Sequence, residues 1–214
     1  PNFDPLTYRY SSRRNVVYAK NGVCCTSVPL GAQVGLDVLK NGGNAVDAAV
    51  AMAGAMPLLE PTGNGLGSDC FALVWIEKEK KLYGLNASGV APMALSADEV
   101  RAKGFSEVPE EGWIPTMVPG APTGWAALNR RFGTKPLSEL FAPAISYAEN
   151  GYAVPVNVGK LWARDSKRIA RVMAQDPAPY EYWWKSFIKP DGSPYRAGDV
   201  FRFPAYADTM RSLV

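Results

Sequence analysis

The stretch EPTGNGLGSDCFALVW (Glu60–Trp75) places three glycines within five positions and follows them with an apolar run. Gly63, Gly65 and Gly67 indicate a backbone that turns sharply or approaches another group closely. The apolar run predicts a β-strand. Three interpretations of the glycines compete: a nucleotide loop, a purely structural turn, or a loop whose backbone N–H groups line a site for an anion or an oxyanion.

The order of the surrounding elements argues against a nucleotide site. A dinucleotide fingerprint needs a strand before its glycines and a helix after them, so that the phosphate meets a helix N-terminus. Here a predicted Ala-rich helix, AVDAAVAMAGAM, precedes the glycines and a strand follows them. A P-loop would also need a G-K-[ST] sequence, which this stretch lacks. The structural turn and the anion-binding loop both remain open.

Local signals predict alternating helices and strands around this loop. Asn44 is a good N-cap for the Ala-rich helix, with Asp47 in its first turn. Two apolar runs joined by the charged turn KEK predict a hairpin. Ser96 and Glu99 have the spacing of a capping box. Strands are expected over residues 22–27, 71–77 and 81–87, and helices over 31–40, 45–56, 96–104, 123–133, 136–150 and 157–173.

The second half of the chain carries weaker signals. Thr123 is a possible N-cap, and Gly133 a stop, for the helix between them. Residues 177–198 look irregular and are rich in aromatic side chains, which favours a solvent-excluded satellite cluster. The last segment, PAYADTMRSLV, begins as a helix at Pro204 but stops without a cap. We interpret the chain as ending inside an element, as one piece of a longer polypeptide.

Composition narrows the function classes. The chain has 214 residues, 47% of them hydrophobic, and a net charge of +3 without a basic stripe, so nucleic acid is not an expected partner. No apolar run is long enough to span a bilayer, and no signal peptide is visible, so we expect no membrane segment and either a cytoplasmic or an already processed protein. Cys24, Cys25 and Cys70 form no C-x-x-C pair, so we interpret them as reduced, at least partly buried thiols and expect no metal or other cofactor.

The sequence contains no histidine. This absence excludes an internal Ser-His-Asp triad, a Cys-His pair and H-E-x-x-H zinc chemistry. If the protein is an enzyme, its base is therefore another group or lies on another chain.

A family resemblance rests on several segments. Residues 42–51, GGNAVDAAVA, match a family pattern residue for residue. Glu60, Pro61, Gly65, Gly67 and Phe71 fit E-P-x-x-x-G-I-G-G-G-x-F at the same spacing, and residues 118–124 fit V-P-G-x-x-x-G. From about residue 22 to its end, the chain resembles the large subunit of gamma-glutamyltranspeptidases.

The resemblance implies an α+β fold, the N-terminal-nucleophile hydrolase sandwich in which two β-sheets lie between helical layers. In that family a precursor cuts itself in two, and the new N-terminal threonine of the small subunit is the nucleophile, with its own α-amino group as base. Such a site needs no histidine. The resemblance implies that residues 1–214 are the N-terminal part of the large subunit. The remainder of that subunit and the small subunit would then be the partners of this chain.

Two departures from the family pattern bear on the substrate. The family has G-G-G where this chain has Gly67, Ser68 and Asp69, and the Asp69 carboxylate would orient a neighbour or disfavour an anionic substrate. The family's D-G-R-E-x-A-P supplies an arginine for the α-carboxylate of the glutamyl group, whereas Ser88 occupies that position here. A serine offers no bidentate charged fork, and the nearest cation in sequence is Arg101. In these respects the chain is similar to the branch that includes cephalosporin and glutaryl acylases.

Other nucleophiles and bases are weaker candidates. Ser68 follows a glycine at a turn but lacks a histidine partner, Pro1 carries a secondary amine, and Cys24 and Cys25 have no activating charge in sequence. We therefore expect a gamma-glutamyltransferase-like amidohydrolase or acyltransferase acting on a small-molecule acyl amide, inactive as this chain alone; the alternative is a non-catalytic binding or structural module that retains the fold. The expected substrate-binding residues are Gly65, Gly67, Ser68, Asp69, Ser88 and Gly89, and no catalytic residue is expected on this chain.

Overall fold

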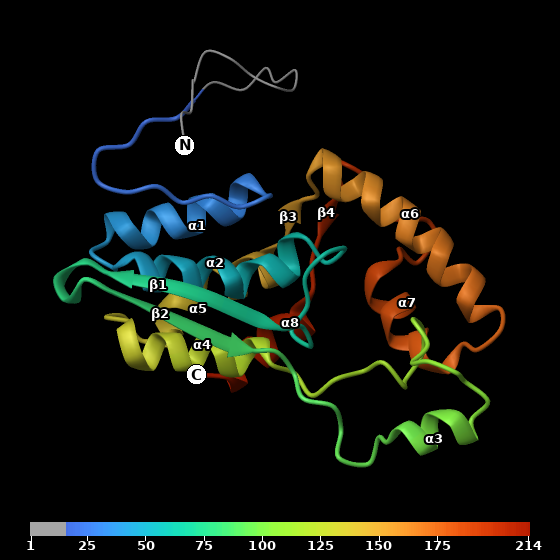
Figure 1. Cartoon of the computed structure of the whole chain (residues 1–214). Coiled ribbons are helices and arrows are strands. Elements are labelled where there is room, and N and C mark those ends of the chain that lie inside the picture. The colour runs from blue at the N-terminus through green and yellow to red at the C-terminus, as the bar shows by residue number, and fades with distance from the viewer. Residues whose placement is uncertain (1–15) are drawn as a thin grey trace.

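The computed structural model describes residues 16–214 (Figure 1). In this part of the chain, two antiparallel pairs, β1–β2 and β3–β4, make up the sheet structure. The elements are α1 (Pro29–Lys40), α2 (Ala45–Leu59), β1 (Cys70–Ile76), η1 (Glu77–Glu79), β2 (Lys81–Ala87), α3 (Ala97–Ala102), α4 (Ala121–Phe132), α5 (Leu137–Asn150), β3 (Tyr152–Ala153), α6 (Val156–Met173), η2 (Ala178–Tyr180), α7 (Glu181–Phe187), β4 (Val200–Phe201) and α8 (Pro204–Ser212).

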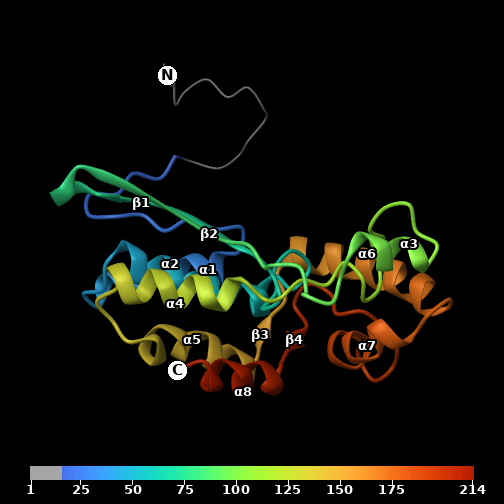
Figure 2. The ribbon, with the colours of Figure 1, turned by 60° about the horizontal axis from the view of Figure 1, so that its bottom comes forward.

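The elements stack in layers. Figure 2 shows the β1–β2 hairpin over a layer formed by α1, α2 and α4, with α5 and α8 beneath that layer. The helices α6, α7 and α3 lie to one side, and β3 and β4 connect this region to the lower layer. Within residues 16–214, no helix combines the length and the apolarity needed to cross a membrane.

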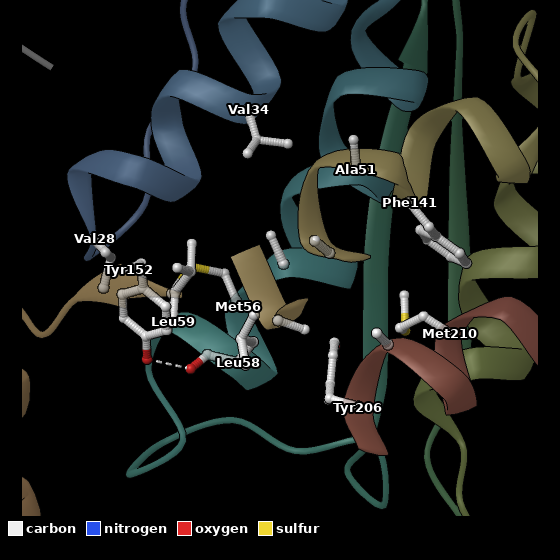
Figure 3. Packing of buried hydrophobic residues seen from close by; sticks show 14 of the residues in the cluster. Val28, Val34, Ala51, Met56, Leu58, Leu59, Phe141, Tyr152, Tyr206 and Met210 are labelled. Atoms are coloured by element: carbon white, nitrogen blue, oxygen red, sulfur yellow. Dashed lines mark hydrogen bonds between the residues drawn. The ribbon is translucent and has the colours of Figure 1, made fainter. Parts of the chain in front are cut away.

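Helix α2 is the centre of the core, as its small residues predict. Its apolar residues Val50, Ala51 and Leu59 are almost completely buried. Gly54 lets the Phe141 ring of α5 approach the helix backbone, because a Cβ at this glycine would lie 2.7 Å from two ring atoms. Figure 3 shows buried side chains of four helices converging, among them Val34 of α1, Ala51 of α2, Phe141 of α5 and Met210 of α8.

The cap of α2 is also a tertiary contact. The Asn44 side chain accepts hydrogen bonds from Val46 and Asp47 N–H, and the Asp47 carboxylate accepts one from Asn44 N–H, which completes the capping box. The same carboxylate is fully buried and accepts hydrogen bonds from the Thr134 N–H, the Thr134 hydroxyl and Lys135 N–H. Burial alone would raise the pKa of Asp47, but these hydrogen bonds outweigh it and hold the pKa below its usual range.

The β1–β2 hairpin is apolar on both faces. Residues of β1 alternate, so that Ala72 and Val74 face the helices, while Phe71, Leu73 and Trp75 point outward and are 66%, 78% and 54% exposed. A solvated strand face is normally polar, so an apolar run on both faces is typical of a sheet that is covered on both sides.

The aromatic residues of the C-terminal third extend the main core. Trp162 of α6 contacts the rings of Phe187, Tyr195 and Phe201, and its indole N–H donates to the Phe187 carbonyl at 2.7 Å. Phe201 is completely buried in that core. The predicted irregularity is partly wrong, because residues 178–187 form η2 and α7. Of the expected aromatic cluster, Phe187 packs against the main core, and Trp183 contacts Trp184 and Phe187.

Two further local predictions are wrong. Residues 22–27 form no strand, because no described strand pairs with them. Their side chains contact the core helix instead: the Thr26 hydroxyl lies 3.4 Å from the Met56 sulfur, and the Ser27 hydroxyl donates to Glu60. Helix α4 begins at Ala121, two residues before Thr123, whose hydroxyl donates to the Gly120 carbonyl within the first turn. The other predicted helices and the hairpin are present within a few residues of their expected bounds.

Candidate functional site

The glycine-rich loop docks onto the start of α4. The Ser68 carbonyl accepts hydrogen bonds from Gly120 N–H at 3.2 Å and Ala121 N–H at 2.8 Å, so one loop oxygen satisfies two amides at the helix N-terminus. Ser68 N–H donates back to the Gly65 carbonyl at 3.1 Å, which closes a tight turn. The loop between α2 and β1 is thereby held against the first turn of α4.

The Asp69 carboxylate reaches across to the segment that follows β2. Its Oδ1 accepts the Gly89 N–H at 2.9 Å, and Ser88 N–H donates to the Asn86 side chain at 2.9 Å. Both amides of the Ser88–Gly89 pair are thus occupied by side chains. Of the two roles expected for Asp69, the geometry favours orientation of a neighbour.

Two glycines allow two backbone segments to meet at this point. A Cβ on Gly89 would lie 2.0 Å from the Val118 carbonyl oxygen, and a Cβ on Gly120 would lie 2.1 Å from the Ala87 oxygen. Val118 N–H donates to the Val90 carbonyl at 3.0 Å. The segment after β2 and the segment before α4 therefore touch backbone to backbone, which only glycine permits.

The close approach lies at different glycines from those that the sequence singles out. Gly65 and Gly67 have no positive φ, and a Cβ at Gly67 would meet nothing within 4 Å. Gly120 is not among the expected substrate-binding residues, although it is the first glycine of the V-P-G-x-x-x-G segment. Gly124, the second, packs against Cys70, with its Cβ position 2.8 Å from Cys70 Cβ.

The glycine loop still presents free backbone donors. Within residues 16–214, no acceptor contacts the N–H groups of Gly65, Gly67 or Asp69. Gly67 and Asp69 are exposed. These N–H groups could donate to an anionic or developing oxyanionic group placed against the loop.

The Ser88 side chain is exposed and receives no hydrogen bond or ion pair from any described residue. Arg101, the nearest cation in sequence, lies on α3 and pairs with Asp98 at 3.1 Å. Figures 1 and 2 both show α3 well away from the end of β2. Arg101 therefore does not replace the family's arginine at Ser88 in this structure.

The remaining candidates have no activating partner in the described part of the chain. Burial raises the pKa of the Cys24 and Cys70 thiols, which disfavours the reactive thiolate. Cys25 is exposed, contrary to the expectation that it belongs to the core. Pro1 lies outside the described residues. Residues 16–214 contain no group of three or more histidine, cysteine or acidic side chains arranged to hold a metal ion.

Comparisons with known proteins agree with this geometry. The family model described as gamma-glutamyltranspeptidase matches residues 31–214. The glutathione hydrolase proenzyme of Bacillus subtilis (strain 168) is 30% identical over 207 residues, which cover 94% of this chain and 33% of that protein. The chain spans about a third of the length of the curated relatives that it matches.

Two solved structures share the fold. The cephalosporin acylase from Bacillus halodurans is 52% identical, with a TM-score of 0.88 over 99% of this chain and 39% of that one. The gamma-glutamyltranspeptidase of Helicobacter pylori is 29% identical, with a TM-score of 0.83 over 92% of this chain and 55% of that one. The expected N-terminal-nucleophile hydrolase fold is confirmed. The chain belongs to the gamma-glutamyltranspeptidase family, which is a family of enzymes.

Proposed function

We propose that the whole protein cleaves or transfers small acyl amides through an acyl-enzyme formed on an N-terminal threonine that lies outside this chain. The residues described above form one wall of the acyl pocket. The observation that carries the substrate class is Ser88, which stands where the family has an arginine and which no described cation contacts.

The proposed nucleophile explains the lack of a histidine. An N-terminal threonine uses its own α-amino group as the base, so this chain needs to supply neither nucleophile nor base. Its contribution is positional: the glycine-loop N–H groups face the reacting carbonyl, and the Asp69–Gly89 hydrogen bond holds the wall in place. The proenzyme name of the Bacillus subtilis relative supports a precursor that is processed before it acts.

The proposed acyl group lacks an α-amino-acid head. Burying an α-carboxylate without a positive partner is costly, and a hydrogen bond to a charged group contributes about 1.5–3 kcal/mol. Replacing an arginine fork by the Ser88 hydroxyl should therefore weaken gamma-glutamyl recognition by about tenfold to a hundredfold. The 52% identity to a protein described as a cephalosporin acylase supports the same direction.

The proposed partner of this chain is the rest of the same precursor. The outward face of the hairpin exposes Phe71, Leu73, Trp75 and Leu82, each more than half accessible. A contiguous apolar face on a sheet marks an interface. In the expected sandwich, the second sheet covers this face.

The experiment uses the full-length precursor. Maturation should yield two polypeptides, the smaller of which begins with threonine, and replacing that threonine by alanine should abolish both cleavage and amide hydrolysis. Ser88→Arg should raise kcat/KM for a gamma-glutamyl anilide relative to a glutaryl anilide by about tenfold. Turnover by residues 1–214 alone would contradict the placement of the nucleophile outside this chain. A mature small polypeptide without an N-terminal threonine would favour a non-catalytic module.

A further inference from the structure

Between its two contacts with the candidate site, the chain makes a long excursion. It leaves the site at Val90 and returns at Val118, and the hydrogen bond from Val118 N–H to the Val90 carbonyl ties the two ends together. The only helix in the excursion is the six-residue α3. Val100 is its one buried hydrophobic residue, while Met93 and Trp113 are largely exposed. The excursion therefore has almost no core of its own and depends on contacts with the rest of the protein.

One such contact is concentrated on Glu111. Its carboxylate forms an ion pair with Arg168 of α6. The carboxylate also accepts a hydrogen bond from the Tyr180 hydroxyl, with 2.6 Å between the two oxygens. The same Tyr180 oxygen accepts the Gly112 N–H at 3.0 Å. The hydrogen bond from Tyr180, together with Arg168, holds the pKa of Glu111 below its usual range, so the carboxylate stays charged at neutral pH. Tyr180 thus binds both the side chain and the backbone of the excursion.

The return arm from this contact to the site is short. Five residues lie between Gly112 and Val118. Their backbone conformation is limited by Pro115 and by a turn in which Thr116 N–H donates to the Trp113 carbonyl. Val118 then lies against Gly89 at a distance that admits no Cβ. A movement of the arm at Glu111 is therefore passed to the backbone beside Ser88.

Arg168, the ion-pair partner of Glu111, also borders a hollow near the glycine loop. This hollow of about 100 Å³ is lined by Arg168 and by Thr62, which lies in the turn that leads into that loop. The Thr62 hydroxyl is buried without a hydrogen-bond partner in the described structure. Arg168 therefore pairs with the excursion through Glu111 and shares a hollow with the turn that precedes the glycines.

We propose that Glu111 is a positioning residue for the acyl pocket: with Arg168 and Tyr180, it clamps the return arm and thereby sets the place of Gly89 and Ser88. This inference rests on the proposed function, because its effect appears in acyl-donor recognition. Glu111 itself touches no reacting atom. The Arg168 side chain is 50% exposed and that of Glu111 is 36% exposed, so the clamp contributes little to global stability and its removal should act mainly on KM.

The test compares variants of the full-length, matured enzyme with a glutaryl anilide as the probe. Glu111→Ala should raise KM about tenfold while kcat falls less than threefold. This loss is smaller than the roughly hundredfold loss of rate expected when a substrate-positioning group is displaced by about one ångström. Tyr180→Phe should raise KM similarly, and the double variant should add little more because both changes release the same arm. Glu111→Gln, which keeps an acceptor for Tyr180, should recover part of the loss.

Glu110→Ala is the matched control. Glu110 neighbours Glu111, is exposed, and forms no ion pair or side-chain hydrogen bond with the described residues. Hydrogen exchange of residues 111–118 should accelerate in Glu111→Ala and not in Glu110→Ala, with melting temperatures within about 2 °C of each other. If the unmutated enzyme turns over but Glu111→Ala keeps the KM of Glu110→Ala, the inference is wrong and the proposed function stands. If the unmutated enzyme turns over no acyl amide, both fail.

Discussion

Gly89→Ala tests the backbone contact on which the candidate site is built. The new Cβ would lie 2.0 Å from the Val118 oxygen, and reaching an ordinary contact of 3.4 Å needs a shift of about 1.4 Å. A shift of that size breaks the Val118–Val90 hydrogen bond and strains the bond from Gly89 N–H to Asp69. An ordinary hydrogen bond contributes about 1 kcal/mol and one to a charged group about 1.5–3 kcal/mol, so the variant should lose about 2–4 kcal/mol of stability.

This loss leaves most domains folded, because unfolding free energies are typically about 5–15 kcal/mol. The larger effect should be on activity, since misplacing a binding group by an ångström costs about a hundredfold in rate. Gly63→Ala is the control, because its Cβ would meet only Glu60 atoms at 4.0 Å and its φ is not positive. Both variants of the full-length protein are assayed for maturation, urea unfolding and kcat/KM. If kcat/KM of Gly89→Ala is within threefold of that of Gly63→Ala, the backbone contact at Gly89 does not position the site.

Three further predictions concern the carboxylates of Asp47 and Asp69. Asp47→Ala should destabilise the protein by about 3–5 kcal/mol in urea unfolding, because it leaves buried donors of Asn44 and Thr134 without an acceptor. The pKa of Asp47 is lower in the folded than in the unfolded protein, so its contribution to the free energy of unfolding is complete above the unfolded pKa of about 3.9 and is lost as pH falls through the folded pKa. The difference in the free energy of unfolding between the unmutated protein and Asp47→Asn should therefore shrink below about pH 4. A difference that stays constant with pH would contradict this. Asp69→Ala should lower kcat/KM about tenfold by releasing Gly89 N–H, with partial recovery in Asp69→Asn; equal rates for Asp69→Ala and the unmutated enzyme would exclude an orienting role.

The parts of the fold that could be predicted from sequence are those whose signals are local. Asn44 and Asp47 lie three residues apart and form a capping box whatever surrounds them. The hairpin follows from two apolar runs joined by a charged turn, but its register does not: β1 begins one residue earlier than expected and pairs Cys70 with Ala87 and Ile76 with Lys81. Residues 22–27 also look like a strand, but a strand needs a partner, and none of the described strands pairs with them.

The site was only partly predictable, because its contacts join distant parts of the chain. The family pattern points to Ser68, Asp69 and Gly89 as residues of one site, but it does not show how they are joined. The hydrogen bond between Asp69 and Gly89 forms only after the hairpin folds back. Sequence favoured Gly65 and Gly67 as the tight positions, since dense glycines look strained in isolation. The close approach depends instead on which backbones meet in three dimensions, and no local pattern marks Glu111 as the partner of a residue 57 positions later.

The proposed substrate class depends on one feature: the pocket wall at Ser88 does not select a glutamyl α-carboxylate. The most direct measurement is the ratio of kcat/KM for glutaryl and gamma-glutamyl anilides, determined with the unmutated, matured enzyme. We expect the glutaryl substrate to be used at least as well as the gamma-glutamyl one, and glutathione to be a poor substrate. A gamma-glutamyl preference of tenfold or more would mean that a cation outside this chain replaces the arginine, and it would contradict the substrate assignment.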